Sequence, residues 1–397
     1  MAIHPPAAWR GYVTVFGAVS ALVAGAVAVL NYQVDPYVTH QWDTPKVGQL
    51  RPSREKLGAW GKTYALAKFR PAIVYAGNSR TELGLPTRTA LFPGKEVFNG
   101  GLSGASLGDA IAMVHHANAV SRLDTVIWGV DVASFSLEAG NTDFDRALVA
   151  SDRFYLARRA LLDIKRALTT DMTMASIRQL RGSSARTCRS SLAFRGQRDD
   201  VCVRDLIDEM GGTAKGIVPR LREYVRGGGP TSEAMAAFDA SVGQLCRSGS
   251  KVRLYINPTH ATSADVLYHA GKWQAMETWQ GQLAALGRRQ RAAGCDVRIF
   301  DFSGFNSVTT EPIPQASGKR DMVYFWEASH YRVNVGSMIL SRMVGGKDDV
   351  PADFGVELMP ETVAAHQAGQ RAARDRYQLD HPLESAMARQ VAAEGLP

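Results

Sequence analysis

Five short apolar segments recur along the chain, and each one ends at a residue that breaks extended structure. They are rich in β-branched and aromatic residues and stop at Gly, Asn, Asp or Pro, which is typical of buried strands. The segments are AIVYAG (72–77), EVFNGG (96–101), DTVIWGVD (124–131), KVRLYINP (251–258) and DVRIFDFSG (296–304). This repetition constrains the fold more than any other feature of the sequence.

Stretches with apolar residues at helical spacing lie between several of these segments. One is SLGDAIAMVHHANAV (106–120), and two others directly precede the fourth and fifth apolar segments. Alternation of strands and helices predicts an α/β fold in which helices cover both faces of a parallel sheet. In such folds the functional site forms at the carboxyl ends of the strands.

An uncharged, almost wholly apolar stretch occupies residues 11–34. About 20 such residues are enough to cross a bilayer. A cleaved signal peptide is the alternative, with AGA or AVA as the cleavage site, but the apolar run is longer than a typical signal core. We therefore interpret 11–34 as a transmembrane anchor preceded by a cytoplasmic N-terminus (1–10). Basic residues occur on both sides of it, so the positive-inside rule does not determine its orientation.

The remaining chain divides by composition. Residues 35–68 are polar, contain prolines and predict a membrane-proximal linker ending in a short helix near Lys56. Residues 69–345 hold the strand segments and predict the main domain. Within it, 140–235 is helix-like and rich in arginine, which indicates a helical insertion; its arginines would face a membrane, an anionic glycan or, more commonly, solvent. Residues 346–397 predict a polar C-terminal tail with one helix-like run.

The formal net charge of +8 favours contact with anionic surfaces such as lipid headgroups or acidic polymers. No nucleic-acid-binding motif accompanies it, so we expect no nucleic-acid partner. The four cysteines have no C-x-x-C spacing, and neither a metal nor another cofactor is expected. Two disulfides in an oxidising compartment and four unbonded thiols remain equally open; the cysteines are Cys188, Cys202, Cys246 and Cys295.

Two segments contain the candidates for nucleophilic chemistry. Ser79, in YAGNSRTELG, follows the first strand, where a parallel sheet would expose it at its edge. A serine hydroxyl needs a histidine base oriented by a carboxylate. His330, in VYFWEASHYR, has Glu327 three residues before it, so one loop carries both groups. The simpler alternatives are a turn that contains a serine and an N-cap arrangement around Ser329.

An oxyanion formed at Ser79 would need hydrogen-bond donors. Candidates are the backbone N–H groups of Ser79 and of Gly104, in the glycine-rich NGGLSGAS segment, and the side chain of Asn257 at the end of the fourth strand. Glycine in such a segment also suits a tight strand-to-helix turn. Three further residues are predicted to contact substrate, and for Arg80 a structural ion pair is the commoner role: Asn78, Arg80 and His260.

The segments GNSRTELG, FNGGLSGAS and FWEASHYR, in this order, resemble the SGNH hydrolase superfamily. The resemblance is to its membrane-anchored bacterial branch, which includes alginate O-acetylation proteins and DltD-like proteins, and it covers roughly residues 30–345. The family's G-D-S motif maps onto residues 77–79, its glycine donor onto Gly104, and its D-x-x-H block onto Glu327 and His330. The sequence departs from the family at Glu327, where aspartate is usual, and it lacks the G-x-N-D block, whose place INPTH occupies.

This resemblance implies a flavodoxin-like three-layer α/β/α fold carried on the periplasmic side of the inner membrane. It further implies a serine esterase or O-acyltransferase that acts on acyl esters, often acetyl, of a cell-envelope or exported polysaccharide. Some members of the branch work beside a multi-spanning acyltransferase, which would be a partner here. The alternative function is that of a catalytically degenerate assembly or glycan-binding component of an envelope complex.

Overall fold

The computed structural model describes most of the chain and divides it into two compact units. One unit is built from Met1–Lys56 and Asp152–Thr187, and the other from Leu57–Ser151 and Cys188–Pro397. The described residues are 7–40, 57–142, 144–146, 149–150, 152–181, 192–209, 211–314, 322–346 and 349–395.

A six-stranded sheet forms the centre of the larger unit, and its strand order is β2-β1-β3-β4-β5-β6. The first five strands pair in parallel, and β6 pairs antiparallel with β5. The strands are β1 (Ile73–Ala76), β2 (Val97–Asn99), β3 (Thr125–Val130), β4 (Lys251–Ile256), β5 (Val297–Asp301) and β6 (Val356–Glu357). The predicted mixed α/β fold with a mostly parallel sheet is therefore confirmed, with one strand more than predicted.

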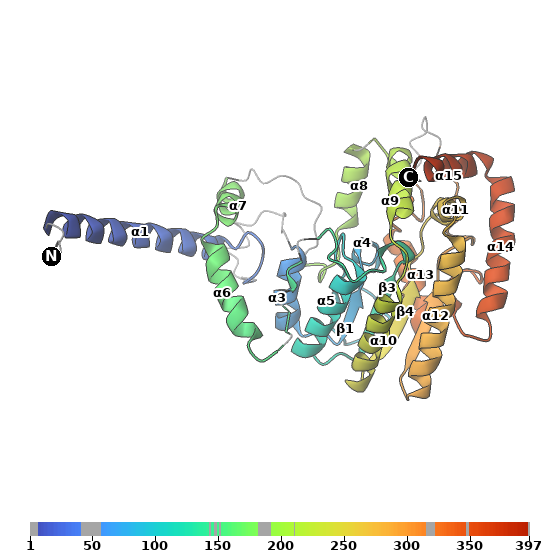
Figure 1. Cartoon of the computed structure of the whole chain (residues 1–397), viewed down its shortest axis with the longest axis horizontal. Coiled ribbons are helices and arrows are strands. Elements are labelled where there is room, and N and C mark those ends of the chain that lie inside the picture. Colours follow the sequence, from blue (N-terminus) through green and yellow to red (C-terminus); the bar gives the residue numbers. More distant parts are fainter. Residues whose placement is uncertain are drawn as a thin grey trace, which may run out of the picture. The chain divides into compact units, whose positions relative to one another are not determined.

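Helices and loops cover both faces of this sheet. One face packs against α3 (Ala59–Phe69), α5 (Leu107–Val120), α10 (Ser232–Arg247) and α12 (Trp273–Ala292) through a continuous apolar core. Three of these helices, α5, α10 and α12, lie in front of the strands in Figure 1. The opposite face packs against α13 (Val333–Val344) and neighbouring loops. Because side chains alternate along a strand, Val74 and Tyr75 of β1 enter different cores.

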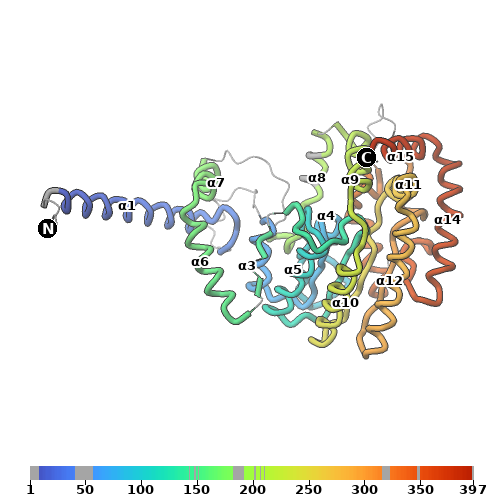
Figure 2. The backbone as a smooth tube through the Cα atoms, in the orientation of Figure 1, coloured from blue at the N-terminus to red at the C-terminus, as the bar shows by residue number. Residues whose placement is uncertain are grey.

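A third apolar cluster joins the helices that follow the strand ends. It combines α9 (Thr213–Arg226), α11 (Ala261–His269), α14 (Val363–Asp380) and α15 (Pro382–Gly395). The backbone trace in Figure 2 shows α15 lying beside α9 and α11. Ala388 and Val391 of α15 are fully or almost fully buried there. The segment 346–397, expected to be a polar tail, therefore adds a strand and two packed helices to the larger unit.

The predicted helical insertion, 140–235, is split between the two units. Its helices α6 (Tyr155–Ala167) and α7 (Thr170–Leu180) belong to the smaller unit. Its later helices, α8 (Asp200–Glu209) and α9, belong to the larger unit. A single arginine-rich stretch of sequence thus contributes to two separate units, which its composition did not indicate. Of the predicted linker, residues 41–56 lie outside the described part.

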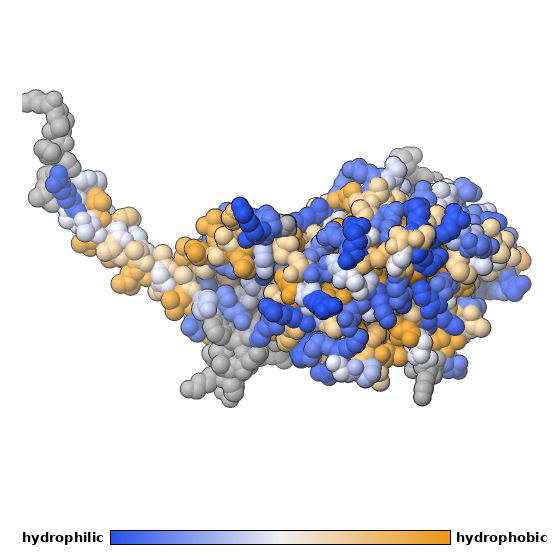
Figure 3. Space-filling view, turned by 90° about the horizontal axis from the view of Figure 1, so that it is seen from below, coloured by the Kyte–Doolittle hydropathy of each residue, from blue (hydrophilic) through white to orange (hydrophobic). Residues whose placement is uncertain are grey.

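Helix α1 (Ala7–Val34) forms the smaller unit together with α6 and α7. Its stretch Trp9–Val34 covers 26 residues, an 18-residue window of which has a mean hydropathy of 2.3, and hydrophobic residues dominate its surface in Figure 3. Among the described residues it is the one helix long and apolar enough to cross a membrane. Near its end, Asn31 donates hydrogen bonds from Nδ2 to the Ala167 carbonyl (2.8 Å) and to Thr173 Oγ1 (2.9 Å).

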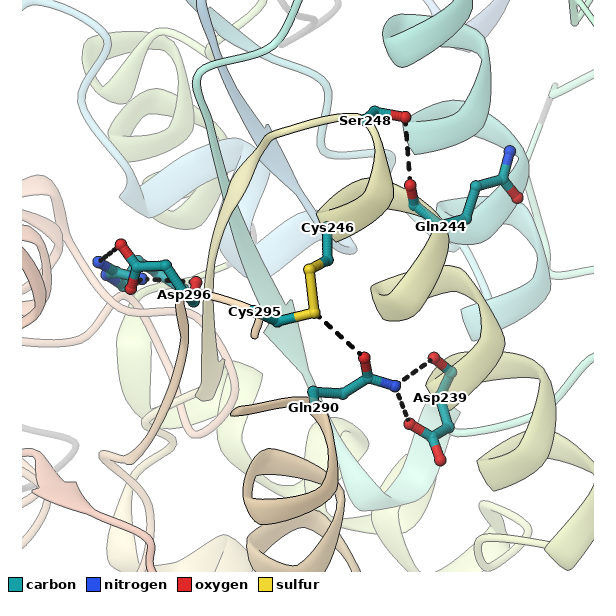
Figure 4. Close-up of a disulfide and its surroundings, with 8 residues drawn as sticks. Asp239, Gln244, Cys246, Ser248, Gln290, Cys295 and Asp296 are labelled. Atoms are coloured by element: carbon teal, nitrogen blue, oxygen red, sulfur yellow. Dashed lines mark hydrogen bonds and ion pairs between the residues drawn. A yellow bond between two sulfur atoms is a disulfide. The ribbon is translucent and has the colours of Figure 1, made fainter. Parts of the chain in front are cut away.

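A disulfide connects the end of α10 to the turn that precedes β5. It joins Cys246 and Cys295, whose Cα atoms lie 5.5 Å apart (Figure 4). Beside it, Gln290 of α12 donates from Nε2 to Asp239 Oδ1 of α10 at 2.6 Å. These contacts fix the two helices on the same face of the sheet. The side chains of Cys188 and Cys202 lie outside the described part.

Candidate active site

The turn after β1 presents Ser79 at the carboxyl edge of the sheet. Gly77 takes a φ of +143°, and a β-carbon on it would lie 2.3 Å from Thr81 Oγ1, so only glycine fits this turn. Asn78 then caps α4 (Ser79–Gly84) by accepting a hydrogen bond on its side chain from the Arg80 backbone N–H. Ser79 is consequently the first residue of a short helix, and its hydroxyl lies at the helix start.

Three side chains that are distant in the sequence meet at this point. Ser79 Oγ lies 2.7 Å from His330 Nε2, and His330 Nδ1 is hydrogen-bonded to Glu327 Oε1. The second carboxylate oxygen of Glu327 accepts from the Ser329 backbone N–H at 2.8 Å. The hydroxyl, imidazole and carboxylate thus form one continuous hydrogen-bonded chain, which is the arrangement that activates a serine nucleophile.

Burial increases along this chain. Ser79 is partly accessible, whereas His330 and Glu327 are 8% and 2% exposed. Burial is the largest influence on the pKa of His330 and lowers it. Glu327 raises this pKa and Arg220 and Arg80 lower it, and the result lies below the ordinary value. Burial raises the pKa of Glu327, but His330 and Arg220 outweigh it, so this pKa lies below its ordinary value. At neutral pH the imidazole is therefore neutral and able to accept a proton, beside an ionised carboxylate.

The loop that carries His330 is held from several sides. The Trp326 N–H donates to the His330 carbonyl at 2.8 Å. The Ala328 carbonyl accepts from the His260 N–H and from Ser263 Oγ, both at 3.0 Å. These bonds restrict the loop conformation that points the imidazole at the serine.

His260 is part of this support and makes no contact that would position substrate. Its Nδ1 accepts from the Thr262 N–H, and its Nε2 lies 2.6 Å from the Glu311 carbonyl. Complete burial lowers the pKa of His260 to about 4, so the ring is neutral at neutral pH. Both ring nitrogens are already used within the fold, and the predicted substrate contact is thus not supported by its position.

Asp131, at the end of β3, links the remaining polar residues of the site. Its Oδ2 accepts from Asn78 Nδ2 at 2.7 Å and from Asn257 Nδ2 at 3.0 Å, and it lies 3.3 Å from Arg80 Nη1. Arg80 also donates from Nη2 to Ser329 Oγ at 2.6 Å. One buried carboxylate therefore connects the serine turn, the fourth strand and the histidine loop. Asp131 was not among the predicted site residues. Its position directly after an apolar strand is the sequence signal that could have identified it.

These contacts change the interpretation of two predicted substrate residues. Arg80 is 8% exposed and joins Asp131 to the loop of His330, which makes it the structural ion pair considered as the alternative. Asn78 is similarly committed, through its side-chain amide to Asp131 and through its side-chain oxygen to the Arg80 N–H. Both residues position the serine turn in this structure.

Two of the three predicted oxyanion donors are free, because the backbone N–H groups of Ser79 and Gly104 make no hydrogen bond to another described residue. The Ser79 N–H lies at the start of α4. Asn257 donates its amide to Asp131 and to the Val130 carbonyl, so it is already occupied. Gly104 has a φ of +74°, and a β-carbon there would lie 1.9 Å from the Asn141 carbonyl oxygen. Gly104 thus occupies a turn that requires glycine, and its role as an oxyanion donor stays a prediction.

Arg220, from α9, is a second residue that the sequence did not identify. Its Nε lies 3.7 Å from Glu327 Oε1, and its side chain is about one-third exposed. Gly216, one turn earlier in α9, packs against the side chain of the same glutamate. Helix α9 thus covers the carboxylate end of the chain and contributes a positive charge to it. No local pattern distinguishes Arg220 from the many other arginines of this region.

A buried ion pair between Glu82 and Lys62 fixes the orientation of α4. Glu82, one turn after Ser79, lies 2.9 Å from Lys62 Nζ of α3 and 3.2 Å from Arg198 Nη2. Because α4 is short, these contacts and its crossing with α13 at Gly84 and Gly336 hold the helix in place. The serine is thereby placed on a rigid element.

Comparison with known proteins leaves the site to be interpreted on its own chemistry. No family model, no curated protein and no solved structure matches the chain. Over the described ranges, no group of three or more His, Cys, Asp or Glu side chains is arranged to hold a metal ion. The hydrogen-bonded chain from Ser79 to Glu327 is the feature from which function is inferred.

Proposed function

We propose that this chain is a serine esterase or O-acyltransferase with an SGNH-like site and fold. The observation that carries the proposal is the hydrogen-bonded series Ser79–His330–Glu327 at the carboxyl edge of a parallel sheet. Ser79 Oγ attacks the carbonyl carbon of an acyl ester while His330 Nε2 takes the hydroxyl proton. Glu327 holds the ring through Nδ1 and stabilises the imidazolium that forms. The Ser79 N–H lies where it can donate to the oxyanion.

The tetrahedral intermediate then collapses to an acyl-serine. The bond to the leaving alcohol breaks, and His330 returns its proton to that alcohol. In the second half-reaction, water or a sugar hydroxyl loses a proton to His330 and attacks the acyl-serine carbonyl. Water yields a free acid, and a sugar hydroxyl yields a new ester; either way Ser79 recovers its proton. Hydrolysis and transfer therefore use the same residues.

The proposed location is the outer face of the cytoplasmic membrane, with α1 as a single-pass anchor. The length and hydropathy of Trp9–Val34 support the anchor. The Cys246–Cys295 disulfide supports an oxidising compartment for the larger unit, because disulfides persist mainly outside the cytoplasm. The acceptor is proposed to be an envelope or exported polysaccharide, and a multi-spanning acyltransferase the partner, from the resemblance of the serine and histidine motifs to the membrane-anchored SGNH branch.

A non-catalytic glycan-binding or assembly role is the second candidate. It is favoured by one observation: the Asn257 amide is bound to Asp131, so one of the three predicted oxyanion donors is already occupied. A binding protein would have no need of an accessible nucleophile. Reactivity of Ser79 distinguishes the two candidates.

Labelling with a fluorophosphonate probe tests the proposal. The full-length protein should be labelled and should hydrolyse a small acetyl ester, and Ser79→Ala should lose labelling and lower turnover by on the order of 10⁴-fold. Ser232→Ala, at an exposed serine of α10, is the matched control and should behave like the parent protein. Undiminished hydrolysis by Ser79→Ala would eliminate the nucleophile, and an unlabelled but folded parent protein would favour the binding role.

A further inference from the structure

Helix α6 carries an apolar stripe that no described residue covers. Phe154, at its start, and Leu161, Ile164 and Leu168 are 58%, 69%, 64% and 48% exposed. The last three follow one another at spacings of three and four residues, so they share one side of the helix. Arg159, on the other side, is buried. A stripe this exposed is unusual for a helix that faces water alone.

The surroundings of the stripe are strongly basic. Residues 152–181 contain seven Lys or Arg and three Asp residues. Arg158 and Lys165 are seven residues apart and therefore lie along one side of α6, where both are at least partly exposed; Arg158 also pairs with Asp152 at 2.7 Å. An apolar stripe bordered by basic side chains is the pattern of a helix that lies in the headgroup region of a membrane.

The attachment of α6 and α7 to α1 places the C-terminal end of this stripe, near Leu168, at one level of the span. The apolar part of α1 before Asn31 comprises about 20 residues, enough for the hydrocarbon core. Asn31 is fully buried, and its amide is bonded to the Ala167 carbonyl and to Thr173. Its neighbour Tyr32 is 44% exposed, as expected of an aromatic residue at a membrane interface. The α6–α7 junction is thus fixed to the point where α1 leaves the hydrocarbon.

We infer that α6 lies in the plane of the membrane surface, with Leu161, Ile164 and Leu168 inserted among acyl chains and its basic residues on anionic phospholipid headgroups. This inference rests on the proposed anchoring of α1 and does not depend on the direction in which α1 crosses. Two features favour a lipid surface over a protein partner: the stripe ends at the α6–α7 junction, which lies at the membrane boundary, and its border is positively charged. The smaller unit would then hold the chain at the bilayer surface through both α1 and α6.

Depth-dependent quenching tests the position of the stripe. The full-length protein is reconstituted alone in vesicles of phosphatidylethanolamine and phosphatidylglycerol, with an environment-sensitive NBD probe on a cysteine introduced by Leu161→Cys. Lipids brominated on their acyl chains should quench this probe. Leu379→Cys, at an 80% exposed leucine of α14, is the matched control, and the parent protein measures labelling of the native cysteines.

We expect stronger quenching and a blue-shifted emission at residue 161, with little of either at residue 379. If the probe at residue 161 is quenched no more strongly than the probe at residue 379, the inference is overturned. Equal quenching is also the result expected if the stripe binds a protein partner, because the vesicles contain no second protein. Resistance of the variants to alkaline carbonate extraction reports on α1 separately, and fluorophosphonate labelling reports on Ser79. Failure of the stripe to insert is thereby distinguished from failure of the anchor or of the proposed activity.

Discussion

At the residue scale, burial and the charges around His330 set the pH range in which the proposed site works. His330 must be neutral to take a proton from Ser79, and its pKa is held below the ordinary value of about 6.5 by burial and by Arg220 and Arg80, against the opposing effect of Glu327. Activity is therefore expected to be full at neutral pH and to fall as the pH drops through the lowered pKa. The acid limb of the profile reports this single imidazole.

Removing the charge of Arg220 should move that limb. Without the guanidinium, protonated His330 is less disfavoured and Glu327 attracts the proton more strongly, so the pKa of His330 rises. The Arg220→Gln variant should therefore lose activity at a higher pH than the parent protein, in a profile of kcat/KM against pH. Arg222→Gln is the matched control, because Arg222 lies on the same helix and pairs with Glu394 instead. An unchanged acid limb in Arg220→Gln would show that Arg220 has no electrostatic role at the site.

At the scale of elements, long-range links hold the helices that cover the sheet. The Cys246–Cys295 disulfide closes a loop with a sequence separation of 49 residues, which contains all of β4, α11 and α12. This loop carries Asn257 and His260, which contact Asp131 and the histidine loop. The disulfide at the ends of α10 and α12 therefore also restrains the segment that carries Asn257 and His260.

Loss of this disulfide should destabilise the larger unit. Chain entropy for a loop of this length predicts a contribution of about 4 kcal/mol, and measured values are often smaller. The Cys246→Ser/Cys295→Ser variant should lose about 2–4 kcal/mol of unfolding free energy in urea. A reductant should destabilise the parent protein by breaking this disulfide. The variant lacks the Cys246–Cys295 pair, so the reductant cannot destabilise it in this way. Equal stability of the parent and variant under oxidising conditions would contradict the structural role of the bond.

At the scale of the whole molecule, the chain forms two compact units, and each is stabilised by its own set of helices. The larger unit needs its C-terminal helix, because α15 packs on both α9 and α11. Helix α9 brings Arg220 close to Glu327. Helix α11 is capped by His260, whose N–H donates to the loop that carries His330. The last helix of the chain therefore supports a site whose nucleophile lies near the start of the unit.

A charge introduced at the buried face of α15 should disrupt this support. Val391 is 2% exposed, so Val391→Asp buries an unpaired carboxylate and should lower the free energy of unfolding by more than about 3 kcal/mol. Ala386→Asp places the same charge on the exposed face of α15 and should change stability by less than about 0.5 kcal/mol. Chemical denaturation measures both. Similar stability of the two variants would mean that α15 is not part of the core.

Much of the fold followed from local pattern. The five parallel strands and the long apolar helix were predicted because apolar runs and helical periodicity are local properties. Strand β6 is two residues long and lies in a polar segment, so it carried no such signal. Of the two C-terminal helices, α14 was predicted as a helix-like run, whereas the packing of both against the larger unit was not, because their exposed faces dominate their composition.

The site was predictable only in part. Ser79, His330 and Glu327 were selected because residue type and position after a strand or in one loop suggested their chemistry; their catalytic role stays a prediction for the probe experiment. Asp131 and Arg220 were missed because their partners are distant in the sequence. Asn257, Asn78 and His260 were assigned to substrate or oxyanion, since the sequence does not reveal which polar groups are already bonded within the fold.

The sequence by itself determined the strand and helix pattern, the apolar helix of the smaller unit and the chemical types available at the strand ends, because these depend on neighbouring residues. Only the tertiary structure decided that Ser79, His330 and Glu327 share one hydrogen-bonded chain, that Asp131 occupies the amides of Asn78 and Asn257, and that α6 joins α1. The physical reason is that such contacts arise when buried polar groups must find partners, and those partners come from whichever elements the packing of the sheet and helices brings together.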